Sequence, residues 1–325
     1  MYAIRVHPAP SSCDPYSPTN PAPSSALQLD EGISVPKPSK PGELLIRLKA
    51  TTVVRDMLTW TETYSHEYAI IGNDFSGIVV DVCGSSDKFK IGDEVFGMTH
   101  VDRAAAWAEF TIATEEEIAL KPKDLTWEQA AALPLSAHTA YEALFVHAGI
   151  AVPSVDVALK NKSQPRPSGQ RILITGAAGA VGIHLVQLAS AAGLHVVAAT
   201  SSDPRNRDFL HSLGANKTIE YAFLDAYQSE FDFIIDAVGG DVLVDSASYD
   251  FVQEHEKRGL RKPSVRALFF IVAGGSSSLQ YLAKLAERGI LQSLVIRTYP
   301  FEDVQEAYEF ANGRHTGRGK VVLIN

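Results

Sequence analysis

A glycine-rich turn stands between a predicted strand and a predicted helix near the middle of the chain. Residues Ile172 to Gly182 read Ile-Leu-Ile-Thr-Gly-Ala-Ala-Gly-Ala-Val-Gly. Glycine permits a tight turn and lets backbone N–H groups approach a pyrophosphate, and a helix N-terminus adds unpaired donors. Because strand, turn and helix follow in this order, the pattern favours a dinucleotide site over a plain turn between packed elements. The residues predicted to contact the dinucleotide here are Gly176, Ala177, Gly179, Ala180, Val181 and Gly182.

The residues after the next predicted strand indicate which dinucleotide is bound. An NAD site normally places an acid there to bind the ribose 2′-hydroxyl. In this chain small hydroxyl residues replace the acid and two arginines follow, namely Thr200, Ser201, Ser202, Arg205 and Arg207. Hydroxyl donors and a cation suit a 2′-phosphate, which an acid would repel. We therefore predict NADP(H), although Ser202 or Asp203 could also serve as an ordinary helix N-cap.

Composition excludes several classes of function. The formal net charge of −9, without a basic run, argues against an extended contact with nucleic acid. Cys13 and Cys83 are too few for a disulfide framework or a four-thiolate zinc site. The segment Met1–Pro8 lacks the apolar core of a signal peptide, and no stretch reaches the apolar length of a membrane span. We expect a cytoplasmic protein that acts on a small molecule and not on a membrane.

A length of 325 residues predicts two domains. Short alternating segments predict a β-rich lobe over residues 1–135, with strands at Tyr2–Val6, Glu43–Ala50, Phe75–Val82, Glu94–Met98 and Ala108–Ala113. Thr126 and Gln129 can form a capping box, Pro134 interrupts that helix, and a helical pattern resumes at 136–146. Residues 151–169 hold three prolines and are predicted to be an irregular linker.

From Arg171 onward, apolar strands alternate with helices, which is typical of a mainly parallel α/β sheet covered on both faces. The predicted strands are 171–175, 195–199, 218–220, 231–237 and 266–272. The predicted helices are 181–192, 205–213 and 279–288. A tail, with a helix at 301–310 and a strand at 320–324, is expected to return to the first lobe.

Several motifs together resemble the zinc-independent branch of the medium-chain dehydrogenase/reductase family, which includes quinone oxidoreductases, alkenal reductases and fungal trans-acting enoyl reductases. Besides the glycine turn, they are Gly72–Gly77, Lys90–Gly97, Ala130–Ala140, Asp236–Gly240 and Arg318–Val322. The resemblance implies a GroES-like lobe at 1–135 completed by 296–325, and a Rossmann NADP-binding domain with a doubly wound parallel sheet at 136–295. It also implies the possibility of a homodimer.

The resemblance further implies cofactor contacts outside the glycine turn. Ser201, Ser202, Arg205 and Tyr221 would surround the 2′-phosphate. The path from adenosine to nicotinamide would run along Thr139, Val238, Phe270, Ile271 and Lys320. Tyr221 could instead be a half-exposed strand aromatic, and Lys320 a solvated charge at a strand end.

Zinc enzymes of the family carry Gly-His-Glu where this chain has Gly72-Asn73-Asp74, and no thiolate lies around Val54–Asp56. Three good ligands are therefore lacking, and we predict no catalytic metal. The chemistry that remains is hydride delivery to an activated C=C bond or a quinone, whose conjugated carbonyl stabilises the developing charge. Tyr64 is the candidate proton donor, or else an aromatic that packs the lobe. The alternatives are an enoyl reductase for carrier-bound polyketide chains and an NADPH-binding protein without turnover.

One connection in the second lobe is too short. Only Val238–Asp241 separates the predicted strand Phe231–Ala237 from a second strand pattern at Val242–Ser246. Parallel neighbours need a crossover of about a dozen residues or more. We therefore expect an antiparallel hairpin, an irregular segment or a gap in the gene sequence here, with lower stability and turnover than in a chain that carries a crossover helix.

Overall fold

A computed structural model describes residues 1–84, 86–163, 169–227, 230–238, 268–313, 315 and 317–325. Internal contacts divide it into two compact units. The first unit holds Met1–Leu135, Ala273–Glu287 and Ser293–Asn325, and the second holds Ser136–Val272 and Arg288–Gln292. The sequence assigned residues 136–295 to the second domain, whereas helix α7 (Ser276–Glu287) packs on strand β7 (Ile118–Leu120) within the first unit.

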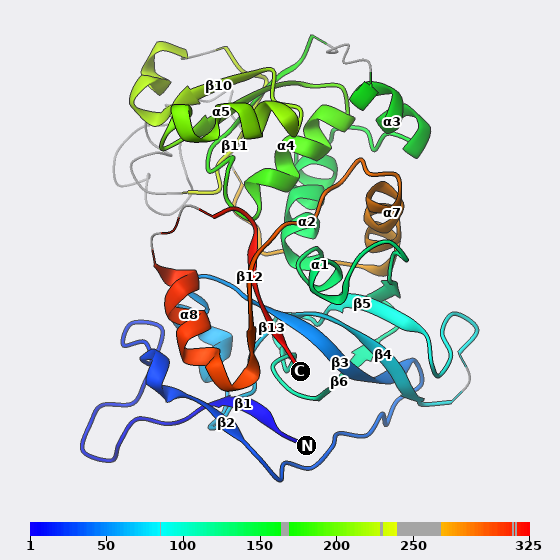
Figure 1. The fold of residues 1–325 in the computed structure, drawn as a ribbon, viewed down its shortest axis with the longest axis vertical. Helices are drawn as coiled ribbons and strands as arrows, with labels where there is room; N and C mark the ends of the chain where they lie inside the picture. The colour runs from blue at the N-terminus through cyan, green and yellow to red at the C-terminus, as the bar shows by residue number, and fades with distance from the viewer. Residues whose placement is uncertain (85, 164–168, 228–229, 239–267, 314, 316) are drawn as a thin grey trace. The chain divides into compact units, whose positions relative to one another are not determined.

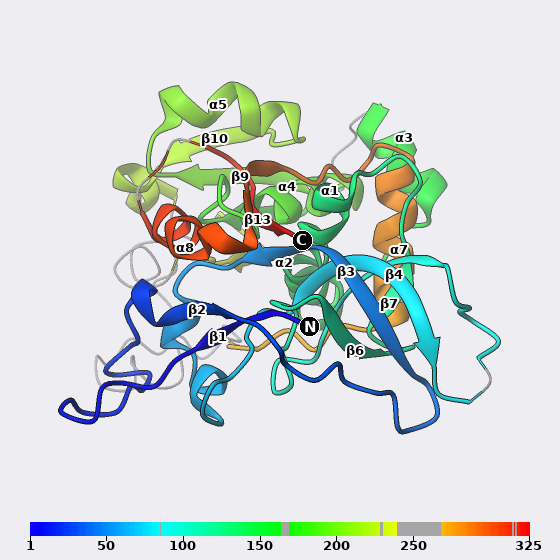
Figure 2. The ribbon, with the colours of Figure 1, turned by 60° about the horizontal axis from the view of Figure 1, so that its bottom comes forward.

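A seven-stranded sheet forms the framework of the first unit. Its order is β12-β13-β3-β4-β5-β7, with β6 paired to β3. The long strands β3 (Glu43–Val53) and β4 (Asp74–Val82) run side by side (Figure 2). The other strands are β5 (Glu94–Met98), β6 (Phe110–Thr114), β12 (Val295–Pro300) and β13 (Lys320–Ile324). The pairing of β13 with β3 confirms that the tail returns to the first lobe.

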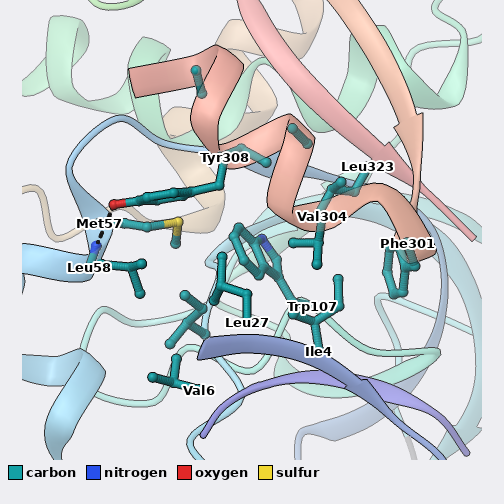
Figure 3. Packing of buried hydrophobic residues seen from close by; sticks show 14 of the residues in the cluster. Ile4, Val6, Leu27, Met57, Leu58, Trp107, Phe301, Val304, Tyr308 and Leu323 are labelled. Carbon is teal, nitrogen blue, oxygen red and sulfur yellow. Dashed lines mark hydrogen bonds between the residues drawn. The ribbon is translucent and has the colours of Figure 1, made fainter. Parts of the chain in front are cut away.

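Both ends of the chain contribute to the apolar core of this unit. Strands β1 (Ala3–Val6) and β2 (Leu27–Asp30) form an antiparallel pair, and helix α8 (Val304–Asn312) packs on β2, β12 and β13. Figure 3 shows Trp107 among the buried side chains of Ile4, Leu27 and Val304. Leu58 N–H donates to the Tyr308 hydroxyl at 3.2 Å in the same cluster. The short 3₁₀ helices are η1 (Ser24–Ala26), η2 (Met57–Thr59), η3 (Thr61–Tyr64) and η6 (Phe301–Asp303).

Helix α1 (Trp127–Ala131) starts at the predicted capping box. Gln129 N–H donates to Thr126 Oγ1 at 3.2 Å, and Thr126 N–H donates to Gln129 Oε1 at 3.1 Å. After the interruption, α2 (Pro134–Tyr141) continues into a π-helix, η4 (Glu142–His147). The predicted irregular linker is wrong over Val155–Ser163, which forms helix α3. Burial of Ala158 and packing of α3 on the helix Gly182–Ala191 (α4) stabilise this helix, and Asn161 Nδ2 donates to the Ala191 carbonyl at 2.8 Å.

The second unit contains a four-stranded sheet, ordered β10-β9-β8-β11, in which every pair is parallel. Its strands are β8 (Arg171–Ile174), β9 (His195–Thr200), β10 (Lys217–Glu220) and β11 (Phe233–Ile235). Helix α4 (Gly182–Ala191) packs on β8 and β9. Helix α5 (Asp203–Ser212) packs on β9 and β10 (Figure 1). The helix η5 (Tyr221–Tyr227) follows β10. The alternation of strands and helices thus produces the predicted parallel sheet.

The predicted strand at 266–272 is not seen in its described part, residues 268–272. Phe269 and Ile271 are 70% and 60% exposed there. A strand needs a hydrogen-bonded neighbour, and the described part of the sheet ends at β11. An apolar sequence pattern alone was therefore insufficient to predict this element. The strand pattern at Val242–Ser246, with its expected hairpin, lies outside the described residues.

Candidate functional site

The glycine turn joins β8 to α4 and takes a conformation that requires glycine. Gly176 has a φ of +63°, and Gly179 N–H donates to its carbonyl at 2.8 Å. A Cβ atom at Gly182 would lie 2.1 Å from that same carbonyl oxygen, far closer than any real contact. The backbone can turn this tightly because neither Gly176 nor Gly182 has a side chain that would hold the end of β8 away from the start of α4.

The same turn presents backbone donors that the protein does not use. Within the described chain, the N–H groups of Ala178, Ala180, Val181 and Gly182 have no hydrogen-bond partner. They lie at the start of α4, where the helix dipole adds positive potential. Such a cluster is suited to a pyrophosphate. The turn therefore fits the phosphates of a dinucleotide.

Tyr221 contacts the turn directly. Its hydroxyl accepts a hydrogen bond from Gly176 N–H at 3.0 Å, and burial raises the pKa of this hydroxyl. The residue begins η5, immediately after β10. Tyr221 is half-buried at the end of the strand, and its contact with a 2′-phosphate stays a prediction.

The segment after β9 is organised by side-chain bonds to helix α5. Thr200 is buried, and its hydroxyl accepts from Asn206 Nδ2 at 2.7 Å. Ser202 stands at the N-cap position of α5, but its side chain makes no capping bond. Ser201 is exposed and Ser202 is half-buried. These two hydroxyls, rather than that of Thr200, remain suitable for an external phosphate.

The two arginines of α5 differ in their surroundings. Arg207 Nε donates to the buried Asp203 carboxylate at 2.7 Å, so this cation is already committed to an acid. Arg205 is exposed on the same helix. Glu220 Oε1 accepts from Asp203 N–H at 2.9 Å, which places a carboxylate at the helix start. Arg205, which follows the hydroxyl residues and is exposed to solvent, stays the predicted ligand of a 2′-phosphate.

The remaining residues predicted to contact the cofactor lie on different elements of the structure. The side chain of Val238 lies beside the turn, since its Cγ2 atom would be 3.0 Å from a Cβ atom at Gly176. Thr139 lies on α2. The rings of Phe270 and His147 have centroids 4.3 Å apart, and Ile271 is exposed. The structure thus brings Val238 and Tyr221 together with the glycine turn.

Lys320 is buried, and its predicted contact with the cofactor stays a prediction. It is 6% exposed, and its Nζ atom bonds to the carboxylate of Asp74 in the first unit. Asp74 Oδ2 also accepts from Thr52 Oγ1 at 2.7 Å, and Oδ1 accepts from Leu135 N–H at 2.6 Å. The alternative of a solvated strand-end charge is therefore wrong, because the lysine has a buried acid as its partner.

Tyr64 has its hydroxyl engaged within the first unit. The hydroxyl donates to the Leu58 carbonyl at 2.5 Å and accepts from Ala22 N–H at 2.9 Å. Burial is the main cause that raises the pKa of this hydroxyl. Proton donation to a substrate would break the bond to Leu58, so the geometry favours the packing alternative.

A cavity in the first unit was not foreseen from the sequence. It is partly open to solvent and has about 20 Å³ of room for the centres of water molecules, and Met57, Trp60, Glu62, Ile71, Asn73 and Arg103 are among its lining residues. The sequence singled out Asn73 solely as a missing metal ligand. Among the described residues, no three His, Cys, Asp or Glu side chains form a group that could hold a metal ion.

Comparisons with known proteins agree with this architecture. The profile of the alcohol dehydrogenase GroES-like domain matches residues 40–123, and that of the zinc-binding dehydrogenase family matches residues 213–323. The protein named "Probable zinc-binding oxidoreductase, mitochondrial" from Arthroderma benhamiae is 35% identical over 302 residues, which cover 87% of this chain and 88% of that protein. The chain belongs to the medium-chain dehydrogenase/reductase family.

Two further similar proteins indicate which type of oxidoreductase within the family this chain is. The 2-methylene-furan-3-one reductase of Solanum lycopersicum is 31% identical over 97% of this chain and 79% of that protein. The structure of the quinone oxidoreductase from Coxiella burnetii is 25% identical, with a TM-score of 0.77 over 100% of this chain and 99% of that one. The chain is therefore an oxidoreductase of the quinone oxidoreductase type with a nicotinamide cofactor. The predicted GroES-like and Rossmann-like α/β fold is confirmed.

None of the helices in the described ranges combines the length and the apolar character needed to cross a bilayer.

Proposed function

We propose that this chain is an NADPH-dependent reductase that delivers a hydride to an activated C=C bond or a quinone without zinc. The observation that carries the proposal is the glycine turn with its unpartnered N–H groups, followed after the next strand by Ser201, Ser202 and Arg205 in place of an acid. Hydroxyls and a guanidinium select the 2′-phosphate that distinguishes NADPH from NADH.

The residues present fit such a cofactor. The N–H groups of Ala180, Val181 and Gly182 would hold the pyrophosphate, and Tyr221 would lie beside it. Pairing of Arg207 with Asp203 reduces the repulsion that this acid would exert on a 2′-phosphate. When bound, the reduced nicotinamide supplies the hydride.

The zinc-free part of the proposal rests on residue types. Asn73 stands where zinc enzymes have an imidazole, and its side-chain nitrogen faces the carbonyls of Thr99 and His100. An amide is a poor substitute for imidazole or thiolate as a zinc ligand. The word zinc appears in the names of a matching family and of a relative. Those names describe those proteins and not the residues of this chain.

The substrate class follows from this lack of a Lewis acid. In an enone or a quinone the conjugated carbonyl delocalises the charge that develops during reduction, so hydrogen bonds are sufficient to stabilise it. The relatives named as a furanone reductase and a quinone oxidoreductase support the same two classes. Since the Tyr64 hydroxyl is engaged with Leu58 and Ala22, we assign the proton to solvent water.

The experiment that tests this function is a screen of NADPH and NADH oxidation with quinones, enones, alkenals and enoyl thioesters. We expect turnover with enones or quinones and a preference for NADPH. Turnover confined to carrier-bound enoyl thioesters would favour the trans-acting enoyl reductase. Tight NADPH binding without turnover of any acceptor would favour a binding protein.

The compartment and the oligomeric state remain predictions. The Arthroderma relative is named mitochondrial, whereas the sequence led us to expect the cytoplasm. Fractionation of cells that express the full gene would decide between them. Light scattering of the purified protein would test the homodimer.

A further inference from the structure

We propose that Glu220 accepts a hydrogen bond from the ribose 2′-hydroxyl of NADH, so that this chain uses NADH as a second cofactor beside NADPH. The inference rests on the proposed function, because it concerns the same dinucleotide site. The sequence pattern singled out the residues after β9, whereas Glu220 comes from the neighbouring strand β10.

Glu220 lies at the edge of the sheet where the dinucleotide turn begins. It is the last residue of β10, and in the parallel register of the two strands it pairs with Thr200, the last residue of β9. Neighbouring strands lie about 4.8 Å apart, and a dinucleotide binds outside the carboxyl ends of such parallel strands. The next residue, Tyr221, bonds to the glycine turn through its hydroxyl. Glu220 is therefore next to the segment that is proposed to meet the adenosine ribose.

One oxygen of this carboxylate is used within the protein, and the other is left over. Oε1 accepts from Asp203 N–H at 2.9 Å, at the first residue of helix α5, where the helix dipole favours a negative charge. Among the described residues no donor bonds to Oε2, and Glu220 is half-buried. The bond through Oε1 holds the carboxylate beside the helix start and leaves an acceptor for a hydroxyl group.

The other acid of this region is not available to a ribose. Asp203 is 7% exposed, and its carboxylate accepts from Arg207 Nε at 2.7 Å. The bonds to Asp203 are the main cause that raises the pKa of the Arg207 guanidinium, and the charge of Glu220 adds to the rise. Arg207 thus balances Asp203, whereas Glu220 forms no ion pair within the described part of the chain. An uncompensated negative charge remains at Glu220.

A carboxylate in this place acts on the two cofactors in opposite directions. It accepts a hydrogen bond from the free 2′-hydroxyl of NADH, as the acid of an NAD site does. It repels the 2′-phosphate of NADPH, which Ser201, Ser202 and Arg205 are proposed to attract. The balance of these effects predicts that the chain binds both cofactors, with a moderate preference for NADPH.

The test compares the dissociation constants of NADPH and NADH for the complete protein, measured by fluorescence titration. Glu220→Gln keeps an oxygen for Asp203 N–H and removes the negative charge. NADH binding should weaken roughly three- to tenfold, as the loss of one hydrogen bond gives. NADPH binding should tighten about two- to fourfold, because one repelling charge is removed from a solvated site.

Two further variants separate specificity from support of helix α5. Glu220→Ala removes the bond to Asp203 N–H as well as the charge, so it should lower the melting temperature, which Glu220→Gln should keep. Glu230→Gln removes an acid that pairs with Arg171 at 2.9 Å, near the amino end of β8, and should leave the cofactor ratio unchanged. An unchanged ratio in Glu220→Gln, an equal loss of affinity for both cofactors in that variant, or the same shift in Glu230→Gln would overturn the proposal.

Binding without turnover distinguishes this inference from the proposed function. If both nucleotides bind and Glu220→Gln shifts their ratio toward NADPH, but no quinone or enone is reduced, the proposed function fails and the role of Glu220 stands. If the parent oxidises NADPH with these acceptors but does not bind NADH, the proposed function stands and the role of Glu220 is wrong.

Discussion

Lys320 and Asp74 form an ion pair that is buried in the first unit and joins the last strand of the chain to β4. The two residues are 246 positions apart, and they are 6% and 1% exposed. Asp74 lies two residues after Gly72, within the motif where zinc relatives carry a ligand set. The pair therefore anchors the segment that lines the cavity.

Lys320→Met should lower the free energy of unfolding by about 3–5 kcal/mol, because it leaves a buried carboxylate without its cation. Urea denaturation followed by circular dichroism measures the effect. The control is Lys123→Met, since Lys123 is exposed. Equal effects of the two substitutions would show that the Lys320 charge contributes no more than a surface charge does.

Gly182→Ala should damage the dinucleotide turn. The new Cβ atom would lie 2.1 Å from the Gly176 carbonyl oxygen, and overpacking of this kind costs about 1–3 kcal/mol. NADPH binding, measured by fluorescence titration, should weaken together with stability. Gly179→Ala is the comparison, because its Cβ atom would stay 3.1 Å from the same oxygen. An equal or larger loss in Gly179→Ala would contradict the geometry of the turn.

Arg205→Ala should weaken NADPH binding by about 1–3 kcal/mol, the range for a charge-assisted hydrogen bond. NADH lacks the 2′-phosphate, so its affinity should hardly change and serves as the internal control. Arg288→Ala, an exposed arginine in the same unit, should affect neither cofactor. An equal loss for both cofactors would remove Arg205 from the 2′-phosphate site.

Stability should fall in mild acid through His195. Burial, with Arg171 and Lys217 nearby, holds the pKa of His195 below its ordinary value of 6.5. The unfolded chain then binds a proton more readily than the folded one, so this contribution is complete above that ordinary value and is lost as the pH falls toward the folded pKa. The melting temperature of His195→Asn should therefore fall less than that of the parent when the buffer is changed from neutral to mildly acidic. A parent and variant with identical pH dependence would contradict this assignment.

The sequence predicted correctly those structural features that are determined by residues close to one another along the chain. The glycine turn, the capping box at Thr126 and the strand–helix alternation each arise within a few residues, so the sequence displays them directly. The return of the C-terminal tail to the first lobe was also foreseen, whereas its pairing with β3 was not. These features identified the fold and the dinucleotide turn.

Features that depend on distant partners were not predictable in the same way. The buried state of Lys320 depends on Asp74, and the engagement of Tyr64 depends on the backbone of Ala22 and Leu58. Residues 268–272 have the composition of a strand, but a strand also requires a neighbour.

The central claim is that this chain transfers a hydride from NADPH to a conjugated acceptor without zinc. The most direct measurement uses protein treated with a strong chelator and analysed for metals, NADPH deuterated at C4, and an enone, with mass spectrometry and NMR of the product. We predict one deuterium at the β-carbon of the saturated ketone, at a rate that chelation does not change. Loss of turnover on chelation with recovery on adding zinc, or a product without deuterium from either C4-labelled form of NADPH, would contradict the claim.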